Sequence, residues 1–246
     1  MPDESLLGPP AVRRRLAGLA QRRLNFDPAA LRHARPEDGW MVTDLCQTLP
    51  SEAPGMPERG GSWDVARALM QGYEFADPSI VRAYYDPAAP LQGRNMLLKL
   101  QALGLFRLFV GVRVGAVYDQ VRRTRAGEVR VWGWNYGTLE GHVEMGQMDW
   151  EVWKWPESGV VEFHVHAVSR RAPIANPIVR LGFRLLRERE RNAFLESTKR
   201  RMRAFTELAL QDPGRREPLR SAAVELTARR SRPADPAHNE LTRRLA

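Results

Sequence analysis

The feature that most constrains the fold is a group of four segments in which apolar and polar residues alternate. Alternation with a period of two is typical of β-strands that bury one face. The turns between several of these segments are very short, as at Ala126–Gly127, and turns this short join antiparallel neighbours. The sequence therefore predicts an antiparallel meander with strands over residues 111–125, 128–139, 147–156 and 160–169.

A long amphipathic helix is predicted after the strands. Asn176 is a suitable N-cap, Pro177 suits the first helical position, and Asp212–Pro213–Gly214 ends the pattern. Within this segment an apolar stripe steps by three and four residues through Leu195, Thr198, Met202, Phe205 and Ala209. Because one face of an antiparallel sheet must be covered, we predict an α+β fold. In it the sheet wraps around the long C-terminal helix, a helix-grip-like arrangement.

The rest of the chain suggests additions to this unit. A basic amphipathic helix is predicted over 11–24, which would be an extra N-terminal helical segment. Further expectations are a helix at 63–72, a short strand at 73–78 and an apolar helix at 94–109 with a break near Gly104. We expect three parts: an N-terminal basic helix and linker (1–62), the helix-grip domain (63–212), and a basic, largely disordered tail (213–246).

Turn lengths suggest which side chains face the helix. A three-residue turn after Pro156 would place Trp153 opposite Phe163, and the neighbouring hairpin would then place Trp134 opposite Glu151. The face under the helix would carry Trp132, Trp134, Tyr136, Trp153, Trp155, Val161, Phe163, Val165 and Ala167, together with the carboxylates Asp119, Asp149 and Glu151.

Carboxylates on an aromatic face must be paired, hydrated in a cavity, or raised in pKa. One interpretation is that they lie at the ends of the sheet or form ion pairs with Arg113 or Arg123. The other is a ligand pocket in which Asp119 and Glu151 supply polar contacts and Tyr136 is a nearby donor. The ligand-binding candidates are Asp119, Trp134, Tyr136, Thr138, His142, Glu144, Asp149 and Glu151.

The segment NYGTLEGHVEMG at 135–146 has a double interpretation. His142 and Glu144 could form an acid–base pair at the mouth of a pocket. Alternatively, Gly137, Gly141 and Gly146 could serve only the geometry of a turn. The chain contains no GxSxG, Walker, HExxH or GxGxxG motif, so no catalytic residue is assigned.

Neither a metal nor a cofactor is predicted. Cys46 is the only cysteine, so the chain contains no CxxC spacing. His164 and His166 would share the face opposite the helix with Glu162, and two such histidines can ligate one ion. No further ligand is adjacent in sequence, so a solvated strand face is the preferred interpretation.

The net charge of +9 is unevenly distributed. Residues 11–35 and 177–205 each carry a net +6, whereas 36–176 carry a net −3. Basic flanks can bind nucleic acid or anionic lipid, but solvated helix faces are favoured because no aromatic residues lie among the arginines. The first 15 residues contain no signal-peptide core, and no apolar run approaches the length of a spanning helix. We therefore expect a soluble, cytoplasmic protein, of undetermined oligomeric state.

The central motif resembles the DUF1990 (UPF0548) family of uncharacterised proteins. The family's hallmark is close to YGTLPGHPERGE, followed by a strand that ends in FSRP. The matching residues are Tyr136, Gly137, Thr138, Leu139, Gly141, His142, Glu144 and Gly146, and later Ser169 and Arg170. The departures are Glu140, Val143, Gln147 and Val168. The resemblance covers roughly residues 63–205.

The resemblance implies a relation to the START/Bet v 1 (SRPBCC) superfamily. It thus implies a small, largely apolar ligand held in a cavity between the sheet and the C-terminal helix. An enzyme that uses the same pocket is the alternative, for instance a cyclase, isomerase or hydrolase with Glu151 or His142 as acid or base.

Overall fold

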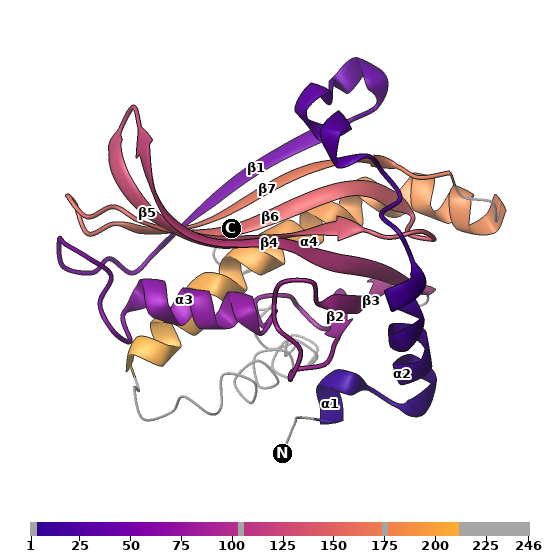
Figure 1. Cartoon of the computed structure of the whole chain (residues 1–246), viewed down its shortest axis with the longest axis horizontal. Helices are drawn as coiled ribbons and strands as arrows, with labels where there is room; N and C mark the ends of the chain where they lie inside the picture. The colour runs from indigo at the N-terminus through magenta and orange to yellow at the C-terminus, as the bar shows by residue number, and fades with distance from the viewer. Residues whose placement is uncertain (1–3, 103–105, 174–176, 212–246) are drawn as a thin grey trace, which may run out of the picture.

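A seven-stranded antiparallel sheet organises the chain in the computed structural model, which describes residues 4–102, 106–173 and 177–211 (Figure 1). The strand order across the sheet is β1-β7-β6-β5-β4-β3-β2. The strands are β1 (Met41–Leu49), β2 (Val81–Tyr84), β3 (Asn95–Ala102), β4 (Phe106–Thr124), β5 (Gly127–Thr138), β6 (Glu144–Lys154) and β7 (Val161–Arg171).

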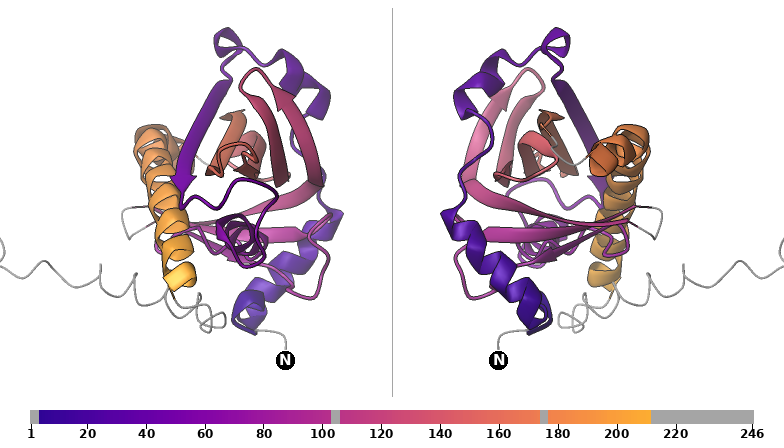
Figure 2. Two further views of the ribbon diagram at one scale, coloured as in Figure 1. Left: turned by 90° about the vertical axis from the view of Figure 1, so that its left-hand side faces the viewer. Right: turned by 90° about the vertical axis from the view of Figure 1, so that its right-hand side faces the viewer.

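Two helices, α3 (Ser62–Gln71) and α4 (Pro177–Gln211), cover one face of the sheet, which we call the inner face (Figure 1). α4 runs beside β1, while α2 (Pro10–Ala17) lies against β3 at the other side of the molecule (Figure 2). The short α1 (Glu4–Leu7) contacts β2. The predicted α+β helix-grip arrangement and its extra N-terminal helical segment are confirmed. No helix among the described residues is long and apolar enough to cross a membrane.

The four strands predicted from the alternating pattern are present, with ends shifted by a few residues. The helix predicted over 94–109 was wrong, because this segment forms β3 and the start of β4. Met96 and Leu98 point into the main core, and Leu97 is buried on the other face with Leu19. A strand buried on both faces is continuously apolar, and periodicity alone does not distinguish it from a buried helix.

The start of the chain also differs from expectation. Residues 41–49, which we expected to precede the domain, form the edge strand β1 and pair with β7 along their whole length. The segment 73–78 was predicted as a strand but forms a turn after α3, with Tyr73 at a positive φ of 56°. The N-cap Asn176 and the tail 213–246 lie outside the described residues.

Aromatic rings fill the described part of the inner face. Trp150 lies 4.4 Å from Phe75 and 6.1 Å from Phe163 between ring centroids. Trp134 and Phe205 are fully buried in the same cluster. The predicted stripe on α4 is buried from Leu195 to Phe205, and Ala209 is half-buried.

The predicted register of β6 was wrong by one residue. Trp153 pairs with Glu162, and Val152 pairs with Phe163. The turn between β6 and β7 holds one residue more than predicted, since the backbone N–H of Trp155 bonds the carbonyl of Val160 at 2.9 Å. A one-residue slip moves every side chain of a strand to the opposite face. Asp149, Glu151 and Trp153 therefore face away from the helices, whereas Trp150, Val152 and Lys154 point inward.

The β4–β5 hairpin is also shifted, but Val117 and Asp119 keep the face that was predicted for them. Asp119 pairs with Trp132 and Val117 with Trp134, so both positions moved by two residues. Because the side-chain period of a strand is two, Asp119 keeps its expected face. An irregularity between Val114 and Val117 interrupts the pairing. Beyond it the hairpin bends away from α3 (Figure 1).

One buried ion pair ties β6 to the segment before α3. The Lys154 side chain is fully buried and its Nζ lies 3.2 Å from Oε2 of Glu52, which is itself only 3% exposed. Lys154 Nζ also donates to the carbonyl of Ala53 at 2.8 Å. Glu52 accepts the backbone N–H groups of Trp63 and Glu58. The pair thus anchors the chain between β1 and α3 to the end of the meander.

Candidate functional site

Polar side chains form rows across the outer face of the sheet, the face away from α3 and α4. Strand pairing aligns Cys46 with His164, His164 with Glu151, Glu151 with Gly133, and Gly133 with Tyr118. Partners that lie opposite each other on one face bring their Cβ atoms to within about 5.5 Å. The correct register thus collects these chemically active side chains from four strands.

This face is hollowed into a cavity of about 630 Å³. That volume lies in the range of small-molecule sites. β4 contributes Tyr118 and Arg122 from the part of the hairpin that bends outward. The lining residues are Asp44, Leu45, Cys46, Tyr118, Arg122, Asp149, Glu151, Trp153, His164, Val165 and His166.

Glu151 is the most heavily bonded group of the cavity. Its carboxylate accepts hydrogen bonds from the two terminal guanidinium nitrogens of Arg122 at 2.6 and 3.0 Å. It also accepts hydrogen bonds from the Tyr118 hydroxyl at 2.5 Å and from the Trp153 indole N–H at 2.6 Å. Burial would raise the pKa of Glu151, but these hydrogen bonds outweigh it and lower the pKa below its ordinary value. Burial and the bond to Glu151 raise the pKa of Tyr118.

This bonding assigns Glu151 a positioning role. A general acid or base must exchange a proton with a substrate, and its pKa is best placed near the working pH. Glu151 is instead held ionised by four hydrogen bonds, so protonation would break the bidentate contact with Arg122. Glu151 therefore fixes the positions of Tyr118, Arg122 and Trp153, which form one wall of the cavity.

Asp149 differs from Glu151 in that no arginine or lysine forms an ion pair with it among the described residues. Its two oxygens accept hydrogen bonds from the amide of Gln147 at 3.0 and 3.2 Å, and the side chain of Asn135 also bonds to the carboxylate. Burial raises the pKa of Asp149, and the hydrogen bonds from Gln147 and Asn135, with the charge of His166, offset part of that effect. Its neighbour across the pair of strands, His166, is engaged by Asp44 at 2.6 Å.

The cavity is acidic although the chain as a whole is basic. Three carboxylates line it, from Asp44, Asp149 and Glu151, against one guanidinium, from Arg122, and the imidazoles of His164 and His166. That guanidinium is already paired with Glu151. Two carboxylates therefore face the space without an arginine or lysine beside them in the described structure, and a cation would be favoured there.

At the β1 side of the cavity, His164 lies between two other side chains. Its Nε2 is 3.1 Å from Oε2 of Glu162 and 3.7 Å from Sγ of Cys46. Burial, and then the charge of Glu162, raise the pKa of the Cys46 thiol to about 11. The ring of Trp153 stacks on His164 with centroids 4.1 Å apart.

The other predicted site residues lie elsewhere. Trp134 and Tyr136 are buried in the inner core, where Tyr136 donates to the sulfur of Met148 at 3.4 Å. Asp119 pairs with Arg130 at 2.7 Å toward the end of the hairpin. The structure therefore brings Asp149 and Glu151 together in the cavity but places Asp119, Trp134 and Tyr136 outside it.

The glycine-rich loop at 135–146 is held in place by hydrogen bonds to its own backbone and to the N-terminal segment. Thr138 Oγ1 accepts the N–H of Gly146 at 2.9 Å and donates to Asn25 Oδ1 at 2.6 Å. The amide of Asn25 in turn donates to the carbonyl of Glu144 at 2.9 Å. The loop is thus fastened to the N-terminal segment, and Leu24 forms a bridge with Leu139. Thr138, His142 and Glu144 do not line the cavity.

Part of the basic N-terminal segment is used in the same contact. Arg22 donates to the carbonyl of Glu140 at 2.8 Å, and the Glu140 side chain accepts the backbone N–H of Arg23 at 3.2 Å. Arg113 donates to the carbonyls of Leu19 and Arg22. These contacts order the segment against the domain.

His142 gives the loop a measurable pH dependence. Burial lowers the pKa of His142 to about 4, and the backbone N–H of Glu144 donates to its Nδ1 at 2.9 Å. The unfolded chain binds a proton below an ordinary pKa of about 6.5, whereas the folded chain does not until about 4. The stability that neutral His142 gives the folded state is therefore fully present above pH 6.5, and it is lost as the pH falls toward 4.

We expect His142→Asn to reduce that loss. Asparagine offers an oxygen near the position of Nδ1 and does not titrate. Urea unfolding of both proteins between pH 7 and pH 4.5 would measure the difference. The variant should lose less unfolding free energy than the parent chain over this range, and parallel pH profiles would contradict the assignment.

Several cavity residues were not predicted. Cys46 and Asp44 come from β1, for which no strand was predicted. Its burial alternates along the strand, but the sequence MVTDLCQTL alternates only weakly in polarity. Tyr118 and Arg122 reach the cavity through the bend of the hairpin, which no local pattern specifies. The outward position of His164, His166 and Glu162 was predicted correctly.

An antiparallel sheet gripping one long C-terminal helix defines an α+β helix-grip protein, and here a polar cavity lies on the other face of the sheet. The sequence matches the family described as "Domain of unknown function (DUF1990)" over residues 27–193. The chain belongs to this family, and the membership predicted from the glycine-rich motif is confirmed. The match begins before β1, earlier than the predicted limit at residue 63. No curated protein matches the sequence.

Solved structures with a similar arrangement include three distant ones. Ara h 8.0201 has a TM-score of 0.37 and 10% identity, covering 67% of this chain and 98% of its own. Major latex-like protein 151 from Panax ginseng has a TM-score of 0.32 and 11% identity, and the match covers 63% of this chain and 97% of the ginseng protein. Human STARD10 has a TM-score of 0.33 and 9% identity, and the match covers 90% of this chain and 88% of STARD10. At these scores the helix-grip description rests on this chain's own sheet order and on α4.

Proposed function

We propose that this protein binds a small organic cation, such as a protonated amine, in the cavity on the outer face. The observation that carries the proposal is Asp149, a half-buried carboxylate in the cavity wall with no ion pair among the described residues. A cation beside Asp149 would favour its charged form and offset the penalty of burial. Asp44, which is bonded to His166 at 2.6 Å, also lines the cavity and would add a second negative charge.

The aromatic residues that line the cavity suit an organic ligand. Trp153 and Tyr118 are held in place by Glu151, so their rings offer rigid apolar surface. An ammonium group close to an aromatic ring gains from the negative face of the ring. The ligand class supported here is thus an amine with an apolar portion small enough for about 630 Å³.

The apolar ligand expected between sheet and C-terminal helix has less support. Trp134, Trp150 and Phe205 fill the described part of that space. A ligand there would have to lie against residues 177–187 of α4, whose side chains are outside the description. Acid–base catalysis by Glu151 or His142 is likewise unsupported. Glu151 is engaged by Arg122 and other donors, and His142 accepts a backbone hydrogen bond within the glycine-rich loop, outside the cavity.

Amide chemical shifts would test the proposal with matched probes. We expect benzylamine, titrated in the presence of a chelator, to shift resonances of β6 and β7, whereas uncharged benzyl alcohol does not. Asp149→Asn keeps the shape of the side chain and should weaken benzylamine binding about fivefold or more, equivalent to ~1 kcal/mol.

Asp38→Asn is the control, because it makes the same change of net charge at an exposed position outside the cavity. It should bind benzylamine as the parent chain does. Equal binding of the amine by the Asp149→Asn variant, or equal binding of the alcohol by the parent chain, would refute the proposed function.

A further inference from the structure

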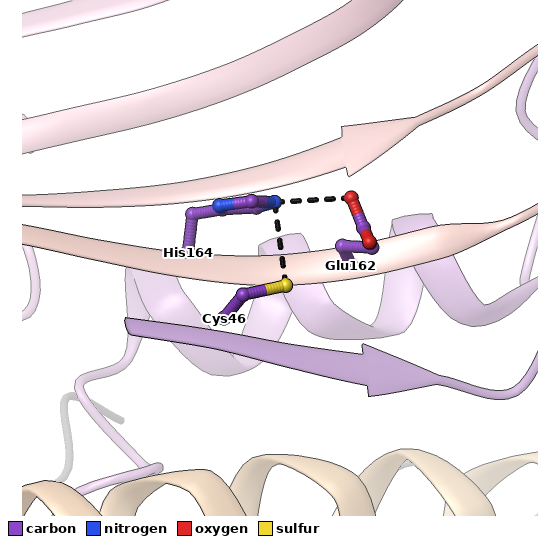
Figure 3. Close-up of side chains that lie close together, drawn as sticks. All are labelled: Cys46, Glu162 and His164. Atoms are coloured by element: carbon purple, nitrogen blue, oxygen red, sulfur yellow. Dashed lines mark hydrogen bonds and ion pairs between the residues drawn. The ribbon is translucent and has the colours of Figure 1, made fainter. Parts of the chain in front are cut away.

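We propose that Cys46, Glu162 and His164 bind a divalent transition-metal ion of the zinc type at the β1 edge of the outer face. The three ligand atoms lie within 4.8 Å of one another (Figure 3). They offer one thiol sulfur, one imidazole nitrogen and one carboxylate oxygen, which are the ligand types that zinc takes in proteins. This inference goes beyond the proposed amine binding and does not depend on it.

The spacing of the ligand atoms fits a tetrahedral site. Zinc bonds of about 2.3 Å to sulfur and about 2.0–2.2 Å to nitrogen and oxygen require ligand atoms roughly 3.4–3.6 Å apart. His164 Nε2 lies 3.7 Å from Cys46 Sγ and 3.1 Å from Glu162 Oε2. Small side-chain rotations would bring both separations to the required value.

Strand pairing fixes this geometry. Cys46 on β1 lies directly opposite His164 on β7, and Glu162 is two residues before His164 on the same face. The three side chains therefore converge from two adjacent strands without any loop (Figure 3). A site built on paired strands has little freedom to disperse its ligands.

Two tryptophans hold the ligands in position. The Trp155 indole N–H donates to Oε2 of Glu162 at 2.8 Å. Trp153 stacks on the imidazole of His164 with an interplanar angle of 24°. Outer contacts of this kind orient metal ligands and commonly change metal affinity by about 10–100-fold when removed.

The ligand set selects the kind of ion. A thiolate and an imidazole favour zinc, cobalt, nickel or copper over magnesium and calcium, which prefer oxygen ligands only. Three protein ligands leave a fourth position, and Cys46 and His164 both line the cavity. A thiolate and a carboxylate also balance a charge of +2, so the loaded site would not repel an amine in the cavity.

Cobalt is the sharpest probe because the chain has one cysteine. A thiolate bound to Co²⁺ gives an intense near-ultraviolet charge-transfer band, which in this protein can arise only from Cys46. We expect the full chain, purified without a histidine tag and treated with chelator, to develop this band with one equivalent of Co²⁺. Zn²⁺ should then displace the cobalt and remove the band.

Variants identify the other ligands. Cys46→Ser should abolish the band, and Glu162→Gln and His164→Ala should each weaken Co²⁺ binding at least about tenfold. His166→Ala is the matched control on the same strand face, and it should leave the affinity unchanged. A cobalt complex without the thiolate band in the parent chain would overturn the proposal. So would an effect of His166→Ala equal to that of His164→Ala.

Discussion

Lys154→Met is expected to destabilise the domain by about 3–5 kcal/mol, the usual loss when one partner of a buried ion pair is removed. Methionine fits the space of the lysine stem but leaves the carboxylate of Glu52, which is 3% exposed, without its cation. It also removes the donor to the carbonyl of Ala53. Urea unfolding at neutral pH, followed by tryptophan fluorescence, would measure the loss.

The double variant Lys154→Met/Glu52→Gln separates charge from packing. Glutamine keeps an oxygen for the backbone N–H of Trp63 but carries no charge to be left uncompensated. We expect the double variant to be more stable than Lys154→Met alone, by about 1 kcal/mol or more. If adding Glu52→Gln lowered stability further, the ion pair would not be the source of the effect.

Gly146→Ala should have an effect of similar size for a different reason. Gly146 has a φ of +145°, and a Cβ atom there would lie 2.0 Å from the carbonyl oxygen of Val168 and 2.7 Å from the Cα of Ser169. Both are backbone atoms of β7, so the strands would have to separate. We expect a loss of about 3–5 kcal/mol, combining the strained φ with overpacking.

Gly55→Ala is the control for the strained backbone alone. Gly55 has a φ of +122°, but nothing lies within 4 Å of the position of its Cβ. Its substitution should cost only about 1–2 kcal/mol. Thermal and urea unfolding of the two variants would give the difference, and equal losses would show that contact with β7 is unimportant.

The sequence predicted the architecture better than the site. Period-two alternation and the stripe on α4 depend on local contacts, and both gave correct elements. The error at residues 94–109 arose because β3 is buried on both faces, with Met96 and Leu98 on one face and Leu97 on the other. A strand with two covered faces loses the alternation by which strands are recognised.

The prediction of the site failed because the turn between β6 and β7 is one residue longer than expected. The predicted faces of Trp134 and Phe163 were correct, but the extra residue between Trp155 and Val160 reversed β6. Asp149 and Glu151 were therefore singled out for sound chemical reasons and assigned to the wrong side. Cys46 was missed as a partner of His164, because pairing between β1 and β7 joins residues 118 positions apart.

The separation of polar rows from the packed core by strand alternation has an evolutionary consequence. Every second residue of β6 and β7 faces outward, so substitutions there alter the chemistry of the cavity while the residues between them keep the interior intact. Relatives with this scaffold can therefore diverge in specificity by single replacements that leave the interior packing undisturbed.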